Sequence, residues 1–93
     1  MAVEQVVTFR LYVAGHLPNS SRAVSNLRAF CETQLSSGYS IDVLDVLENP
    51  DAALSESIFM TPQLVVQSGT GKHVLIGDLS DASRLAQLLA DGP

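Results

Sequence analysis

Residues 6–20 read VVTFRLYVAGHLPNS, and this stretch decides the fold. Its first eight residues are mostly β-branched, aromatic or otherwise apolar, which predicts a strand. Gly15 and Pro18 then break the strand pattern, and Asn19 or Ser20 can cap a following helix. A strand that runs through a short turn into a helix N-terminus is the usual place for an active site in an α/β protein. Here the turn holds no cysteine, no acid and no glycine-rich phosphate loop, so an enzyme's scaffold is present without its chemistry.

Residues 20–36 predict an amphipathic helix, because apolar residues recur there at every third or fourth position. Gly38 follows this helix and suits the left-handed conformation in which many helices end. Cys31 lies in the apolar stripe, which we interpret as a small buried thiol. The stripe consists of Ala23, Val24, Leu27, Phe30, Cys31 and Leu35.

Residues 41–47 are dense in β-branched side chains and predict a second strand, parallel to the first through a right-handed crossover. Asn49 as a cap and Pro50 in the first turn then predict a short helix over residues 52–58. Pro62 stands where the next strand begins, which is tolerated at a sheet edge or after a cis bond.

Two short apolar runs, residues 64–66 and 74–76, flank a glycine turn at residues 69–71 and predict an antiparallel hairpin. Asp78 and Asp81 suit the N-terminus of a last helix, whose buried stripe would be Ala82, Leu85, Ala86 and Leu89. The order is therefore β-α-β-α-β-β-α. It predicts one mixed sheet with helices on both faces, the arrangement of a thioredoxin-like α/β domain.

The composition is that of one folded domain, spanning residues 1–93. Apolar residues make up 46% of the chain, which excludes a disordered protein. The net charge of −5 argues against nucleic acid and anionic membranes as partners, because both need a positive patch. No apolar run is long enough to span a bilayer, and residues 1–5 show no signal-peptide pattern. With a single cysteine, we expect a protein of the reducing cytoplasm.

The motifs for catalysis are incomplete. A thioredoxin-type redox centre needs Cys-x-x-Cys at the start of the first helix, but residues 16–20 contain no thiol and Cys31 lies about three turns further on. Residues 69–72, GTGK, resemble the end of a phosphate-binding loop but lack its first glycine and its final serine or threonine. His16 and His73 lack metal-ligand spacing, and we interpret both as surface residues, of which His16 could also contact a partner. We therefore predict no catalytic residue, no metal and no cofactor.

Asp42 and Asp45 lie on the predicted second strand, with Glu48 beyond it. Positions three apart on a strand face opposite sides, so these two acids are not expected to form a carboxylate pair. Two interpretations stay open. The acids either contact a partner at a sheet edge or keep that edge from aggregating.

Seven short blocks extend from residue 11 to residue 80: LYVAG (11–15), PNS (18–20), RA (22–23), DVL (45–47), NP (49–50), TP (61–62) and IGDLS (76–80). In this order and spacing they resemble the KaiB family of clock proteins, and the likeness covers residues 8–81. The sensor domain of the histidine kinase SasA is similar through the second strand and the Thr-Pro segment. The last block favours KaiB.

The resemblance implies a non-enzymatic adaptor that docks on a KaiC-type ATPase, modulates its phosphorylation cycle, displaces a SasA-like kinase and captures a KaiA-like protein. It also implies a monomer or a homo-oligomer (dimer or tetramer), and two folds. One fold is thioredoxin-like, and the other is a ground state with a rewired C-terminal half. Pro62 resembles the thioredoxin cis-proline near that switch, and proline isomerisation is slow enough to time a conformational change. Residues 80–90 are mostly good helix formers, so we expect the thioredoxin-like state to be the more populated one.

Proteins of this family dock through the first helix and the second strand, so the resemblance places Arg22, Ser40, Asp42 and Asp45 at the partner contact. Clock KaiB proteins usually carry Ala and Lys where this chain has Ser40 and Asp42, which reverses a charge at the interface. We therefore expect a divergent KaiB with a divergent KaiC as its partner. Two other functions stay open: a binding module in stress or signalling regulation without a KaiC partner, and a thioredoxin-fold enzyme of unknown chemistry.

Overall fold

The computed structural model describes residues 7–35, 38–68 and 71–90. Its elements follow one another in the predicted order, and their boundaries differ from the predicted ones by a few residues. They are β1 (Val7–Val13), α1 (Pro18–Gln34), β2 (Tyr39–Asp45), α2 (Pro50–Ser55), β3 (Gln63–Ser68), β4 (Gly71–Ile76) and α3 (Ala82–Ala90).

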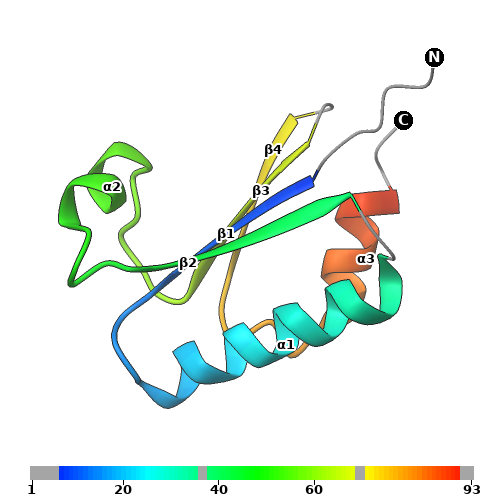
Figure 1. The fold of residues 1–93 in the computed structure, drawn as a ribbon, viewed down its shortest axis with the longest axis horizontal. Coiled ribbons are helices and arrows are strands. Elements are labelled where there is room, and N and C mark those ends of the chain that lie inside the picture. The colour runs from blue at the N-terminus through cyan, green and yellow to red at the C-terminus, as the bar shows by residue number, and fades with distance from the viewer. Residues whose placement is uncertain (1–6, 36–37, 69–70, 91–93) are drawn as a thin grey trace.

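The strands form one mixed sheet in the order β2-β1-β3-β4 (Figure 1). β1 lies parallel to β2, as predicted, with Val13 opposite Asp45. β3 runs antiparallel to β1 and to β4. Residues 69–70, in the predicted hairpin turn, lie outside the described residues, but the flanking strands pair as expected up to Ser68 and Gly71. β2 and β4 are consequently the two edge strands.

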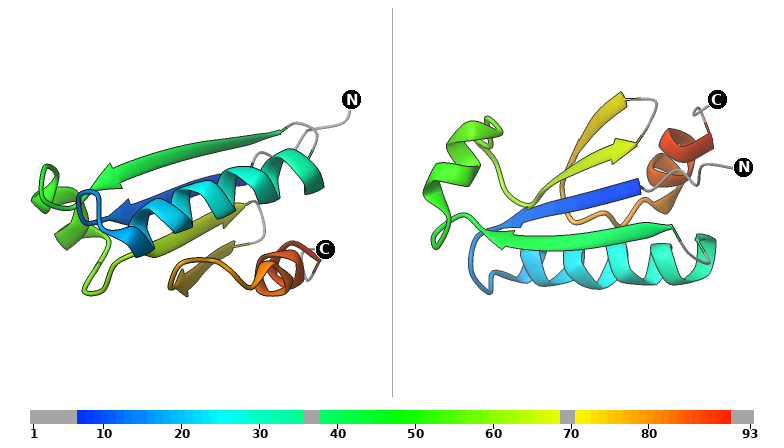
Figure 2. Two further views of the ribbon diagram at one scale, coloured as in Figure 1. Left: turned by 90° about the horizontal axis from the view of Figure 1, so that it is seen from below. Right: turned by 45° about the horizontal axis from the view of Figure 1, so that its top comes forward.

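Helices cover the two faces of the sheet unequally (Figure 2). α1 and α3 pack on one face, and α2 lies over one end of the other face, where Ala53 and Ile58 meet Tyr12 and Val65. The prediction of helices on both faces is confirmed. The main core, on the α1 and α3 side, consists of Phe9, Leu11, Val13, Ala23, Leu27, Phe30, Cys31, Leu64, Val66, Leu75, Leu79 and Leu85.

The turn from β1 into α1 differs from the prediction. α1 begins at Pro18, with Leu17 in the N-cap position and no side chain capping the helix. Asn19 and Ser20 are therefore not caps, because the proline ring favours the first helical position and the helix starts there. Ser20 is instead buried, and its Oγ accepts a hydrogen bond of 3.2 Å from the backbone N–H of Ala14. The hydroxyl thus fixes the end of β1 against the first turn of α1.

β2 begins earlier than predicted, because the N–H of Val7 donates to the carbonyl of Gly38 at 2.9 Å and pairing starts there. The strand ends at Asp45, whose Oδ1 accepts a hydrogen bond of 2.9 Å from the N–H of Leu47. Asn49 occupies the N-cap position of α2 as predicted. Its side-chain amide donates to the carbonyl of Asp45 at 3.1 Å rather than accepting from the helix.

The segment that leads into β3 contains a cis peptide bond between Thr61 and Pro62. Pro62 directly precedes β3, so the prediction that this proline stands at the start of a strand is confirmed. The beginning of α3 also matches the prediction, because Oδ1 of Asp81 accepts a hydrogen bond of 3.1 Å from the N–H of Ser83. None of the helices in the described ranges is long and apolar enough to cross a membrane.

Candidate protein-binding surface

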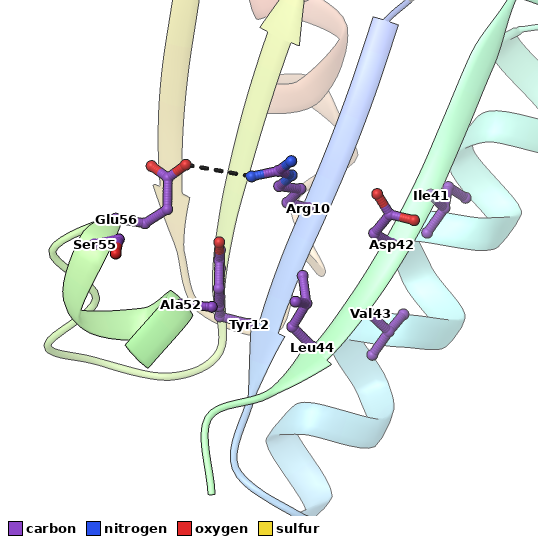
Figure 3. Close-up of a pocket in the computed structure, with 9 residues that line it drawn as sticks. All are labelled: Arg10, Tyr12, Ile41, Asp42, Val43, Leu44, Ala52, Ser55 and Glu56. Carbon is purple, nitrogen blue, oxygen red and sulfur yellow. Dashed lines mark hydrogen bonds and ion pairs between the residues drawn. The ribbon is translucent and has the colours of Figure 1, made fainter. Parts of the chain in front are cut away.

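A groove lies on the open face of the sheet, between α2 and the strands β1 and β2 (Figure 3). Its volume is about 590 Å³, which is within the range of ligand pockets. We call it the sheet groove. It is lined by Arg10, Tyr12, Ile41, Asp42, Val43, Leu44, Ala52, Ser55 and Glu56.

Glu56 bridges two cations beside the sheet groove. Its Oε2 lies 2.6 Å from Nζ of Lys72 on β4, and its Oε1 lies 3.4 Å from Nη1 of Arg10 on β1. The Glu56 side chain is 20% exposed, so both ion pairs are only partly open to solvent. The residue after α2 is thereby tied to two strands of the sheet.

Two acceptors in the sheet groove have no partner among the described residues. Asp42 lies directly opposite Arg10 in the parallel register of β1 and β2, but Arg10 pairs with Glu56 instead. Asp42 is exposed and makes no hydrogen bond or ion pair with any residue that the structure describes. Tyr12 is 1% exposed, and its hydroxyl is likewise without a partner in the described ranges.

A second groove, about 570 Å³ in volume, lies on the other side of β2, between that strand and the first half of α1. We call it the helix groove. Asp45 and Glu48 give it an acidic rim beside the apolar side chains of Val24 and Val43. It is lined by Val13, Gly15, His16, Ser20, Ser21, Val24, Ser25, Val43, Asp45, Glu48 and Asn49.

The four residues predicted to contact a partner lie on different surfaces. Asp42 lines the sheet groove and Asp45 lines the helix groove, so the prediction that these acids face opposite sides is confirmed. Ser40 is exposed on the same edge strand. Arg22 lies on the other flank of α1, where its side chain donates to Asn19 and its charge acts on a loop carboxylate before α3. The structure brings Ser40, Asp42 and Asp45 onto one strand and leaves Arg22 apart.

The thiol predicted to be buried is in the main core. Cys31 has no measurable exposure, and burial raises the pKa of its thiol to about 11. It therefore stays protonated at neutral pH and is a poor nucleophile. His16 is exposed, as predicted, and His73 is half-buried. No group of three or more potential metal ligands occurs within residues 7–35, 38–68 and 71–90.

Sequence reasoning did not single out Arg10, Tyr12 or Glu56. Arg10 could have been noticed, because it is a charged residue in the middle of an apolar strand. Residues two apart on a strand face the same side, so Arg10 and Tyr12 both point away from the main core. Glu56 carried no such signal, since its partners lie 46 and 16 residues away in the chain.

The sequence matches a known family over most of its length. The family model described as the KaiB domain matches residues 10–90. A circadian clock oscillator protein KaiB of Synechococcus sp. is 40% identical over 85 residues, which are 91% of this chain and 71% of that protein. The protein of the same name in Parasynechococcus marenigrum is also 40% identical over 85 residues, 91% of this chain and 82% of that one. The circadian clock protein KaiB3 of Synechocystis sp. is 33% identical over 79 residues, 85% of this chain and 78% of that one.

Solved structures agree with the predicted fold. The N-terminal domain of SasA from Synechococcus elongatus superposes with a TM-score of 0.79 at 26% identity, covering 100% of this chain and 93% of that domain. Chloroplastic thioredoxin z superposes with a TM-score of 0.73 at 18% identity, covering 91% of this chain and 80% of that protein, which shows the fold alone. The thioredoxin-like α/β architecture is thereby confirmed. By its sequence, this chain belongs to the KaiB family.

Proposed function

We propose that this chain is a non-catalytic adaptor that binds a KaiC-type ATPase and modulates its phosphorylation cycle. Its 40% identity to circadian clock oscillator proteins over 91% of the chain is the observation that carries the proposal. KaiA-like and SasA-like proteins are further candidate partners. The likeness to a SasA domain supports the proposal that this chain and a SasA-like protein compete for one docking site on the ATPase, because two proteins of the same shape can occupy the same surface.

The proposed contact is the edge strand β2 with the adjoining flank of α1. Within the described residues β2 pairs on one side only, with β1, so its other edge is available to a partner. Ser40 and Asp42 are exposed on this strand, and a groove opens on each of its faces. Arg22 would contact the same partner only if the interface extended around α1.

The absence of catalysis is proposed from the chemistry at the start of α1. No thiol stands there, and the thiol of Cys31 is buried and protonated at neutral pH. An insulin-reduction assay tests this part of the proposal. Reduction above background that Cys31→Ser abolishes would contradict it.

A second candidate function is a binding module in stress or signalling regulation that works without a KaiC partner. Asp42 favours this second function. A KaiC-type partner that is adapted to the lysine of clock KaiB proteins would present negative charge at this position, and that charge would repel Asp42. The two functions make opposite predictions for the same binding experiment.

The deciding experiment is size-exclusion chromatography of the chain alone and after overnight incubation with ATP and the KaiC-type ATPase of its own organism. Co-elution with the ATPase supports the adaptor. Separate elution, also with a phosphomimetic ATPase, supports the second candidate.

Variants then test whether β2 makes the contact. Asp42→Lys should weaken binding by about tenfold or more, because it places a reversed charge at the interface. Asp42→Asn and Gln87→Lys form a matched pair, since each raises the net charge by one unit and Gln87 is exposed on α3, away from the contact. Asp42→Asn should weaken binding and Gln87→Lys should leave it unchanged. Equal affinity and equal association rate for all three variants would exclude β2 as the interface.

A further inference from the structure

The two edge strands of the sheet differ in charge. β2 carries two acids, Asp42 and Asp45, and charges of one sign along an edge oppose pairing between copies of a chain. β4 carries no acid, and its one charged residue, Lys72, is held by Glu56 at 2.6 Å. No proline interrupts β4 either. Of the two edges, β4 is therefore the one that is less protected against pairing with another strand.

The register of β3 and β4 decides which backbone groups of β4 face outward. The N–H of Gly77 donates to the carbonyl of Pro62 at 3.0 Å, one step beyond the last register pair of the two strands. Hydrogen-bonded and non-hydrogen-bonded pairs alternate along antiparallel strands, so every second residue of β4 bonds inward to β3. Among the described residues, no backbone group bonds to the N–H and C=O groups of the other three. These outward-facing residues are Lys72, Val74 and Ile76.

The outward-facing residues also expose apolar side chains. Val74 lies opposite Val65 in the register, and Val65 belongs to the small core cluster with Ala53 of α2, so these side chains are on the α2 face of the sheet. Val74 is 48% exposed and Ile76 is 51% exposed. Leu75 between them is buried and anchors the strand to the main core. Exposed apolar side chains beside free backbone donors and acceptors are typical of an edge that accepts another strand.

A second copy of β4 is complementary to this edge. When two β4 strands pair antiparallel about Val74, this residue exchanges both of its hydrogen bonds with its counterpart, and Lys72 lies opposite Ile76 of the second copy. The pairing satisfies all three outward-facing residues on both strands. It also packs the two Val74 side chains beside each other and places no two charges opposite each other.

We infer that two copies of this chain associate through β4, antiparallel and about a two-fold axis at Val74, so that their sheets become one continuous sheet. The inference goes beyond the proposed function and does not depend on it, because β2 lies at the far edge of each sheet and stays free (Figure 1). The dimer presents two β2 edges that face away from each other.

The test is sedimentation equilibrium of the isolated chain over a concentration series that reaches about 1 mM. It is run at about 0.15 M salt, which screens the repulsion between two copies of net charge −5 beyond about 8 Å. The average mass should rise with concentration from that of a monomer to that of a dimer. A mass that stays at the monomer value, or that grows beyond the dimer value, would overturn the inference.

Charge variants at the axis locate the interface. Val74→Lys and Val74→Glu each place two like charges side by side and should weaken self-association at least tenfold. An equimolar mixture of the two variants should restore the dimer, because opposite charges then meet at the axis. Val43→Lys makes the same change on β2, where Val43 is 40% exposed, and should leave self-association unchanged. Equal weakening by Val43→Lys, or no recovery in the mixture, would contradict pairing through β4.

Amide hydrogen exchange of the unchanged chain distinguishes β4 from any other contact between copies. The N–H groups of Lys72, Val74 and Ile76 should exchange at least tenfold more slowly where the dimer predominates than where the monomer does, since each then donates to the second copy. Unchanged exchange of these amides in a dimer would overturn the inference. Protection that appears only after the KaiC-type ATPase is added to a monomeric chain would overturn it too, and would assign the β4 edge to that partner. The co-elution experiment tests the proposed function separately, because it succeeds or fails whether or not the free chain is a dimer.

Discussion

Glu56 and Lys72 form the shorter of the two ion pairs among the described residues, with Oε2 of Glu56 lying 2.6 Å from Nζ of Lys72. Glu56 directly follows α2, and Lys72 lies on β4, an edge strand of the sheet. The pair therefore connects the smallest helix to the strand furthest from β2. The second pair, from Glu56 to Arg10, ties the same carboxylate to β1.

Replacing Glu56 by Gln should lower the free energy of unfolding by about 1 kcal/mol, because two partly exposed ion pairs are lost. The loss should shrink in about 1 M salt, where such pairs are screened. Urea denaturation at low and high salt measures both effects. Glu32→Gln is the control, since Glu32 is exposed on α1 and has no ion pair with a described residue. An equal loss in both variants would show that the ion pairs of Glu56 contribute nothing.

Ser20→Ala should lower the free energy of unfolding by about 1–2 kcal/mol, because the N–H of Ala14 loses its acceptor in a partly buried turn. Ser21→Ala on the exposed side of the same helical turn should change it by less than about 0.5 kcal/mol. Urea denaturation of the two variants provides the comparison. A stability of Ser20→Ala equal to that of Ser21→Ala would contradict the structural role of the buried hydroxyl.

The thiol of Cys31 should be almost unreactive in the folded chain. With its pKa raised to about 11 by burial, only about one molecule in a thousand carries the thiolate at pH 8. Iodoacetamide labelling followed by mass spectrometry should detect slow modification in buffer and rapid modification in urea. Equal rates in the two conditions would place the thiol at the surface instead of in the main core.

Acid should destabilise the chain through the two carboxylates before α3. Hydrogen bonds from the N–H of Ser80 to Asp78 and from the hydroxyl of Ser83 to Asp81 lower the pKa of each carboxyl in the fold. A lowered folded pKa means that this stabilisation is complete well above the unfolded value of about 3.9 and is lost as pH falls through the folded values.

The thermal midpoint should accordingly fall between pH 5 and pH 2, and the double variant Asp78→Asn, Asp81→Asn should show a shallower fall over that range. Scanning calorimetry across this interval gives both curves. Parallel curves for the two proteins would show that other groups cause the acid sensitivity.

The state with α3 should be the more populated one in solution. α3 spans Ala82–Ala90, a segment of good helix formers without glycine or a β-branched residue. Backbone chemical shifts from Leu85 to Leu89 should therefore be helical. Strand-type shifts over these residues would show that the rewired state is the dominant one.

The order of elements could be predicted because each element has its own local pattern. Each of these patterns depends on near neighbours only: the β-branched run of β1, the spacing of Ala23, Leu27 and Phe30 in α1, and the glycines at positions 69 and 71 of the predicted hairpin. The buried position of Cys31 and the opposite faces of Asp42 and Asp45 also follow from local periodicity.

The starts and ends of elements were less predictable, because polar side chains have more than one possible partner. Ser20 has the chemistry of a cap, but the helix begins earlier at Pro18 and the hydroxyl bonds to Ala14. Asn49 occupies its predicted cap position, yet its amide bonds to the carbonyl of Asp45. The pairing of Arg10 with Glu56 rather than with its register neighbour could not be predicted, because it depends on where α2 packs.

The unequal covering of the sheet has a consequence for how this chain can diverge. The apolar contacts that hold the domain together lie mainly beneath α1 and α3, whereas Arg10 and Asp42 stand on the less covered face. The charge of Asp42 can be exchanged in evolution with little penalty in folding, because substitutions of exposed residues without partners usually change stability by less than about 0.5 kcal/mol. An aspartate on β2 is therefore a change that the architecture permits, and under the proposed function a lineage can acquire a new partner without first acquiring a new core.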